Sequence, residues 1–384
     1  MASSSTRPSF SSSALRAART FAGMTLAEVG RSIDSSRQYV QLLEDGQRAP
    51  NDATIVQLAS TLRVRPVFFQ RPAGNRIDED SVFFRCSAST PQREMDRARS
   101  GVELFQQLIL HLGRQIKFPR IAIPSIEAHD DEEIEAAASR CRHALQLGHD
   151  GPVGNVVRAV ERAGIFTADL PGASGAIDAF SVKSEPRVIV RSSAKGSTSR
   201  ARFDVAHELG HLVMHSRAIR GERGLEVAAD RFAGAFLLPR ESFAREFPSS
   251  AQRVWPILFR LKARWGTSIQ AMVVRGSQLG LIDPSRSSSL WAYISRRGWR
   301  RAPEPEEPPA EVPELIPLAF LELHRARRVR PREILDEVGW TDDLFERVVG
   351  FAVAREVLDL GAGVVLNLRD YARGNGPTGR SDSR

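Results

Sequence analysis

The segment His207-Glu208-Leu209-Gly210-His211 constrains the fold of this chain more than any other feature. Two histidines four residues apart lie one turn apart on the same face of an α-helix, where both imidazoles can bind one metal ion. The residues that flank the pair are apolar: Phe203, Val205, Ala206, Leu209, Leu212 and Val213. The spacing therefore predicts a buried helix over residues 199–215 that carries a metal site.

The residue types around the two histidines are those of a zinc hydrolase. Glu208 directly follows the first histidine, which is the position of the general base in HExxH enzymes. Zinc lowers the pKa of bound water, and a nearby carboxylate then takes the proton as that water attacks a carbonyl group. Because catalytic zinc needs a third protein ligand, we expect Glu226 on the next predicted helix, residues 225–238, to provide it. Asp230 lies one turn further and is placed to accept the free N–H of a ligand histidine.

His215 is a rival third ligand, since it lies one further turn along the same helix as His207 and His211. Three side chains in a straight row do not easily surround one ion, because the outer pair lies about 12 Å apart along the axis at 1.5 Å per residue. We therefore prefer Glu226. A chance occurrence of the motif is the alternative to a metal site, and the apolar flanks argue against it.

These segments resemble a known family, the ImmA/IrrE-like metallopeptidases. The resemblance rests on RFDVAHELGHLVMH and the EVAADRFAGAFLLP that follows, and on DAFS (178–181), PRVIV (186–190) and LKARWGTSIQAMVVRGSQLGLI (261–282). It covers roughly residues 80–300. The resemblance implies an α+β zincin-like core in which His207, His211 and Glu226 hold zinc and Glu208 is the base. It also implies a site-specific protease that cleaves a repressor-like protein.

Residues 14–71 resemble the Cro/CI (XRE) helix-turn-helix, with helices over 14–22, 25–31 and 36–44 and the closing segment EDGQRAP (44–50). The third helix of such a domain enters the major groove and presents its first residues to base edges. The candidates for DNA contact are Ser36, Arg37, Gln38 and Gln41. Residues 1–72 hold nine Arg against five Asp and Glu, a net charge of +4 that favours phosphate contact. The alternative is a helical module for protein contact.

One departure from the helix-turn-helix pattern lies at Leu26, where many relatives have Gln after the Thr that opens the second helix. The change weakens one expected phosphate contact without overturning the assignment.

Composition and charge narrow the classes of protein. Lys and Arg exceed Asp and Glu by 54 − 46 = 8, which favours a polyanionic partner, although the arginines are spread along the chain. No apolar run approaches the roughly 18 residues that cross a bilayer, and no apolar secretory segment is present. The two cysteines, Cys86 and Cys141, form no CxxC pair. We therefore expect a cytoplasmic protein with no membrane contact, no disulfide framework and no thiolate zinc site.

The patterns predict a multidomain chain: an all-α helix-turn-helix domain, then an α+β zincin-like metallopeptidase domain with a helical C-terminal extension. Strands are expected at 165–167, 179–182 and 188–190. The expected parts are a disordered tail (1–12), the helix-turn-helix domain (13–72), a helical connector (80–150), the metallopeptidase domain with trailing helices (151–300), and a Pro/Glu-rich linker or exposed loop, a small helical module and a disordered tail (301–384).

Two functions of different classes follow from these features. The first is a DNA-binding transcriptional regulator whose zinc endopeptidase domain cleaves a repressor-like protein. The second is a transcription factor whose zincin-like domain is a non-catalytic sensor or a partner-binding module. The intact motif with Glu226 favours the first, and the fused DNA-binding domain is what the second requires. Because XRE domains usually bind two half-sites as dimers, a homodimer is expected.

Overall fold

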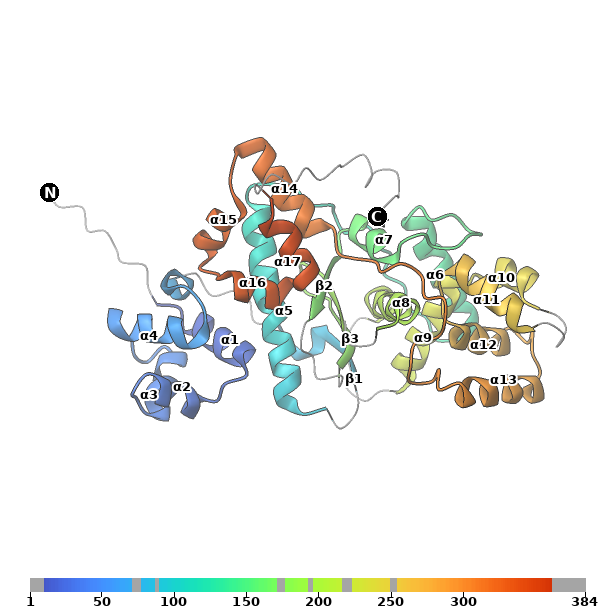
Figure 1. Ribbon diagram of the computed structural model, residues 1–384, viewed down its shortest axis with the longest axis horizontal. Coiled ribbons are helices and arrows are strands. Elements are labelled where there is room, and N and C mark those ends of the chain that lie inside the picture. The colour runs from blue at the N-terminus through green and yellow to red at the C-terminus, as the bar shows by residue number, and fades with distance from the viewer. Residues whose placement is uncertain are drawn as a thin grey trace, which may run out of the picture.

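The computed structural model describes residues 10–70, 77–86, 90–170, 177–192, 196–215, 223–248 and 254–360. Figure 1 shows an elongated molecule with the N-terminal helices at one end, a small sheet near the middle and a second group of helices at the other end. Within the described ranges, none of the helices has the length and apolar character that a bilayer span requires.

The N-terminal region is entirely helical. Its elements are α1 (Ser12–Ala22), α2 (Leu26–Ser32), α3 (Arg37–Glu44), α4 (Asp52–Leu62) and the short 3₁₀ helix η1 (Pro66–Gln70). The side chains of Ser11, Thr25, Ser36 and Asn51 cap α1 to α4 by accepting a first-turn N–H. The second and third helices therefore start one residue later than expected, because Thr25 and Ser36 are caps rather than first helical residues.

The expected disordered tail over residues 1–12 is wrong at its C-terminal end. Helix α1 already begins at Ser12, and Ser11 caps it. The Phe10 ring lies 5.7 Å from the Phe69 ring between centroids. These contacts order the segment despite its serine-rich composition. Residues 1–9, and the tail expected after residue 360, lie outside the described residues.

A four-stranded sheet has the order β1-β3-β4-β2. The strands are β1 (Val82–Cys86), β2 (Phe166–Leu170), β3 (Ile177–Val182) and β4 (Val188–Ser192). Strand β3 pairs antiparallel with β1 and β4, and β2 pairs parallel with β4. Three of the strands were predicted. Strand β1 was not, and it lies in the region expected to be a helical connector; a 3₁₀ turn, η2 (Glu79–Ser81), precedes it.

The two faces of the sheet belong to two different hydrophobic cores. Val188 and Val190 of β4 lie in one core and Ile189 lies in the other, because successive strand residues point to opposite faces. The first core contains the N-terminal helices, α5 (Gln92–Gly113), α14 (Leu315–Arg327), α15 (Pro331–Val338), α16 (Asp342–Val349) and α17 (Phe351–Leu358). The second contains α6 (Asp131–Ala144), α7 (Val156–Arg162), α8 (Thr198–Met214), α9 (Arg223–Leu237), α10 (Arg240–Glu246), α11 (Val254–Trp265), α12 (Ile269–Gln278) and α13 (Pro284–Arg296).

The N-terminal helices join the C-terminal helices through backbone contacts. The Arg65 amide donates to the Gly339 carbonyl at 2.9 Å, and the Thr341 hydroxyl donates to the Arg63 carbonyl at 2.8 Å. Gly339 has φ 73° and packs so closely that a Cβ there would lie 2.4 Å from the Phe68 amide nitrogen. Only glycine fits this conformation and this approach. The N-terminal region is therefore packed onto the rest of the protein at this point.

Residues 303–313 contain no helix or strand, as expected of the Pro/Glu-rich segment, but they are not simply an exposed loop. Glu304 accepts the amides of Ile269 and Gln270 at the start of α12. Two further glutamates of the segment do the same elsewhere: Glu307 accepts the first-turn amide of Ser199 in α8, and Glu311 accepts those of Val156 and Val157 in α7. Carboxylates are favoured at helix N-termini because free amides and the helix dipole meet them there.

Glu161 also accepts amides at a helix N-terminus, but it lies on α7, and the amides belong to the helix that follows the Pro/Glu-rich segment. Its carboxylate is fully buried on α7 and accepts the amides of Glu314 and Leu315 at the start of α14, together with the Thr167 hydroxyl at 2.6 Å. Burial raises the pKa of Glu161 to about 7, against the effect of these hydrogen bonds. These hydrogen bonds therefore connect the start of α14 to α7.

Candidate metal centre

Helix α8 carries the two histidines and packs directly against α9. At the crossing point Gly210 faces Phe232, and a Cβ on Gly210 would lie 2.9 Å from the ring carbon Cδ1. His207 and Glu208 have no exposed surface, and His211 is 1% exposed. The absence of a side chain at residue 210 thus lets α9 come close to the histidine face of α8.

His207, His211 and Glu226 come together as one cluster. The two Nε2 atoms are 3.1 Å apart. Oε2 of Glu226 lies 3.4 Å from Nε2 of His207, and Oε1 lies 3.4 Å from Nε2 of His211. Zinc–nitrogen bonds of about 2.0–2.1 Å in a tetrahedral site separate neighbouring ligand atoms by about 3.3 Å. The spacing of these three groups therefore fits a zinc ion.

Each histidine of the cluster is oriented through its other ring nitrogen. Nδ1 of His207 lies 2.8 Å from the Asp230 carboxylate, and Nδ1 of His211 lies 2.8 Å from Nδ1 of His215. A hydrogen bond that Nδ1 donates fixes the tautomer whose Nε2 lone pair is free for a metal. Asp230 thus lies beside His207, and His215 lies beside His211 and outside the group formed by His207, His211 and Glu226.

Glu208 is buried beside the cluster. The Ser181 hydroxyl of β3 donates to its Oε2 at 2.6 Å, while its Oε1 is buried and has no hydrogen-bond partner among the described residues. A buried carboxylate oxygen without a partner is costly unless something else binds there. Ser181 lies inside the DAFS segment, but its contact with Glu208 was not anticipated.

Strand β1 adds two residues that the sequence analysis did not single out. The Arg85 guanidinium bridges Asp204 of α8 at 3.2 Å and Asp230 of α9 at 3.4 Å. The Phe83 ring stacks on the His211 imidazole, with centroids 4.8 Å apart. Arg85 therefore holds in place the carboxylate that orients His207. No local signal could have revealed this, because the partners lie far along the chain.

The pKa values in the cluster favour a positive charge at its centre. Burial alone lowers the pKa of His207, but hydrogen bonds to Asp230 and Glu226 outweigh it and raise the value to about 9. Burial raises the pKa of both carboxyl groups, and their hydrogen bonds to imidazole outweigh it and hold those pKa values low. Burial and a neighbouring imidazole lower the pKa of His215 to about 4, and burial raises the pKa of Glu208. Glu226 and Asp230 thus favour a positive charge beside them, and a bound cation would supply it.

The candidate DNA contacts lie on α3 or directly before it. Ser36, Arg37 and Gln38 are exposed, and Ser36 also accepts the Tyr39 amide. Gln41 is half-buried and donates to Asp45 at 2.9 Å, so its amide is already engaged within the helix. On the opposite side of α3, Val40 and Leu43 face the core and have no exposed surface.

Comparison with protein families matches two parts of the chain. The IrrE N-terminal-like domain, a peptidase family, matches residues 160–277, and the helix-turn-helix domain matches residues 15–69. The chain joins an XRE-type DNA-binding domain to an ImmA/IrrE-like metallopeptidase domain. His207, His211 and Glu226 lie inside the first match, whereas β1 and its Arg85 lie outside it. No curated protein matches the chain.

Proposed function

We propose that this protein is a DNA-binding transcriptional regulator whose metallopeptidase domain is an active zinc endopeptidase. The observation that carries the proposal is the geometry of the cluster. Two Nε2 atoms and one carboxylate lie at tetrahedral ligand spacing, and both Nδ1 atoms are already hydrogen-bonded. His207, His211 and Glu226 would hold the zinc.

Each residue around the cluster has its own role in peptide hydrolysis. Zinc, when bound, supplies Lewis acidity that polarises a carbonyl group and makes water easier to deprotonate. Glu208 acts as the general base: Ser181 holds its Oε2, and the free Oε1 takes a proton from the attacking water and later passes it to the leaving amine. Asp230 and His215 hold the imidazoles of His207 and His211 in a fixed orientation through contacts at their Nδ1 atoms. Glu226 is half-buried, which leaves the cluster approachable from the α9 side.

We further propose that residues 13–72 bind DNA through the start of α3. Arg37 and Gln38 would contact base edges, as exposed side chains at the start of a recognition helix do in this class of domain. The substrate would be a regulatory, repressor-like protein. Support for this proposal comes from the match to the IrrE N-terminal-like peptidase family and from the helix-turn-helix domain in the same chain.

The test measures zinc content and cleavage together. The purified full-length chain should bind about one zinc, and it should cleave a repressor-like protein encoded next to its own gene. Glu208→Gln keeps the size of the side chain but removes the base, so cleavage should fall by several orders of magnitude while zinc and fold remain. Glu322→Gln, an exposed change of the same kind on α14, is the matched control.

Two outcomes would contradict the proposal in different ways. Unchanged cleavage by Glu208→Gln would mean that the proteolysis comes from another source. Zinc binding without cleavage of any candidate repressor would favour the non-catalytic sensor instead.

A further inference from the structure

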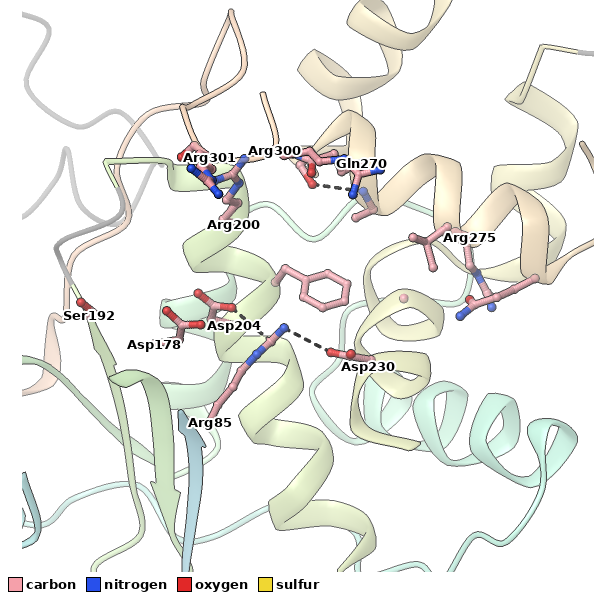
Figure 2. Close-up of a pocket in the computed structure, with 16 residues that line it drawn as sticks. Arg85, Asp178, Ser192, Arg200, Asp204, Asp230, Gln270, Arg275, Arg300 and Arg301 are labelled. Carbon is pink, nitrogen blue, oxygen red and sulfur yellow. Dashed lines mark hydrogen bonds and ion pairs between the residues drawn. The ribbon is translucent and has the colours of Figure 1, made fainter. Parts of the chain in front are cut away.

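A cavity of about 690 Å³ adjoins the metal cluster (Figure 2). Asp230 is part of its wall and also accepts the Nδ1 hydrogen bond of His207, so the cavity and the cluster share a residue. Helices α8, α9 and α12 form its sides, and the ends of β1, β3 and β4 contribute Arg85, Asp178 and Ser192. The cavity therefore lies next to His207 of the cluster.

The two ends of the cavity differ in charge. Near the cluster, Arg85 is paired with Asp204 and Asp230. At the other end, Figure 2 shows Arg200, Arg300 and Arg301 next to one another. The cluster end therefore holds paired charges, and the far end holds three guanidinium groups.

None of those three arginines has a carboxylate partner in the described part of the chain. Arg200 donates to backbone carbonyls of residues 299, 301 and 302. Arg300 donates to the Ser295 hydroxyl at 2.8 Å and lies 5.0 Å over the Trp291 ring. These contacts hold the Arg200 and Arg300 side chains in place without neutralising their charge. Guanidinium groups held in this way bind carboxylates well, often through two parallel hydrogen bonds.

The wall between the two ends includes apolar side chains. Phe203 of α8 lies between Arg200 and Asp204 in the sequence, and α12 adds Ala271 and Val274. A bound chain would therefore meet apolar surface first and the arginines afterwards.

We propose that this cavity is the specificity pocket of the endopeptidase and takes an acidic side chain of the protein substrate. The inference rests on the proposed peptidase function. Along α8, Arg200 precedes His207 by seven residues, about 10 Å at 1.5 Å per residue. An extended peptide covers that distance in about three residues. The substrate then carries Asp or Glu about two to four residues from the cleaved bond, with apolar side chains in between.

The first experiment profiles cleavage sites. The zinc-loaded full chain digests a library of proteome-derived peptides, and mass spectrometry reads the cleavage positions. The wild type should show one enriched acidic position two to four residues from the cut. Arg300→Glu with Arg301→Glu should lose that preference or change it to Lys and Arg. Arg296→Glu with Arg297→Glu, exposed and outside the cavity, changes the net charge equally and should keep it.

A second measurement does not depend on cleavage. Glu208→Gln protein is titrated with two labelled ten-residue peptides that differ only in having Glu or Lys three residues from a central apolar pair. The Glu peptide should bind about tenfold more tightly, and the Arg300→Glu/Arg301→Glu change should abolish the difference. Equal binding of the two peptides, or a preference that survives charge reversal, overturns the pocket. Absence of cleavage together with this binding preference would refute the proposed peptidase activity and leave the acid-binding pocket standing.

Discussion

The close contact between Gly210 and Phe232 makes the position of α9 sensitive to a single methyl group. In Gly210→Ala the new Cβ would lie 2.9 Å from Cδ1 of Phe232 and 3.2 Å from its Cβ and Cγ. Normal contact would require α9 to move by roughly 0.5 Å or more, since packed interiors have no free space to absorb the clash. Zinc sites tolerate errors of only about 0.2 Å in ligand distance, so a shift of Glu226 on the same helix should be felt at the metal.

We expect two effects of comparable size. Overpacking should lower the free energy of unfolding by about 1–3 kcal/mol, measured by urea denaturation of the zinc-free protein. Zinc affinity should fall at least tenfold, or about 1.4 kcal/mol, in a competition assay against a zinc-binding dye. Gly234→Ala on α9 is the control, because its Cβ would meet only Arg275 at 3.6 Å and Gln278 at 3.7 Å. That change should be neutral or slightly stabilising.

The reasoning would be refuted if Gly210→Ala bound zinc as tightly as the wild type and unfolded at the same urea concentration. A loss of stability without a loss of zinc affinity would also contradict it, because the clash would then be relieved without a displacement of Glu226. Phe232→Ala introduced into the Gly210→Ala protein should restore part of the zinc affinity, since it removes Cγ and Cδ1, two of the three carbon atoms that the new methyl group meets.

Three further predictions test other parts of the molecule. His215→Ala should weaken zinc binding by about 10–100-fold, whereas His207→Ala should abolish it; equal losses would mean that His215 is itself a ligand. Glu161 has a folded pKa of about 7 against an ordinary 4.5, so its contribution is present at low pH and lost as pH rises through 7. Between pH 5 and 8 the wild type should lose up to about 3 kcal/mol relative to Glu161→Gln in urea denaturation, and parallel pH profiles would contradict this. Arg37→Ala should cost about 1–3 kcal/mol on the specific operator and far less on random DNA in a gel shift; equal losses would assign Arg37 to phosphate contact.

The parts of the molecule that could be predicted are those with a local signal. The spacing of His207 and His211 fixes a helix face, and Glu226 is the one carboxylate that the following helix can bring over it with a second acid one turn further on. The helices of the DNA-binding domain carry their own caps at Thr25 and Ser36. Such signals depend on neighbours within a few residues, so they can be recognised without knowledge of the fold.

The parts that were missed depend on partners far along the chain. Strand β1 is five residues long and includes Arg85, and its pairing with residues 177–182 leaves no trace in its own composition. The Pro/Glu-rich segment was interpreted from composition as a linker or exposed loop. Composition indicates only that such a segment favours contact with water. The three helix N-termini whose amides donate to Glu304, Glu307 and Glu311 come from elsewhere in the sequence.

One hydrophobic core contains residues from both ends of the chain, so the domains recognised in the sequence are not independent folding units. Residues of the DNA-binding helices, one face of the sheet and the helices after residue 314 form a single cluster of buried side chains. A fragment cut after the peptidase region would expose the face of the sheet that contains Val188 and Val190. A fragment of the first 72 residues would likewise lose the backbone partner of Arg65. The DNA-binding helices are therefore separate from the C-terminal helices in sequence, but the two groups should unfold together with the sheet face that they share.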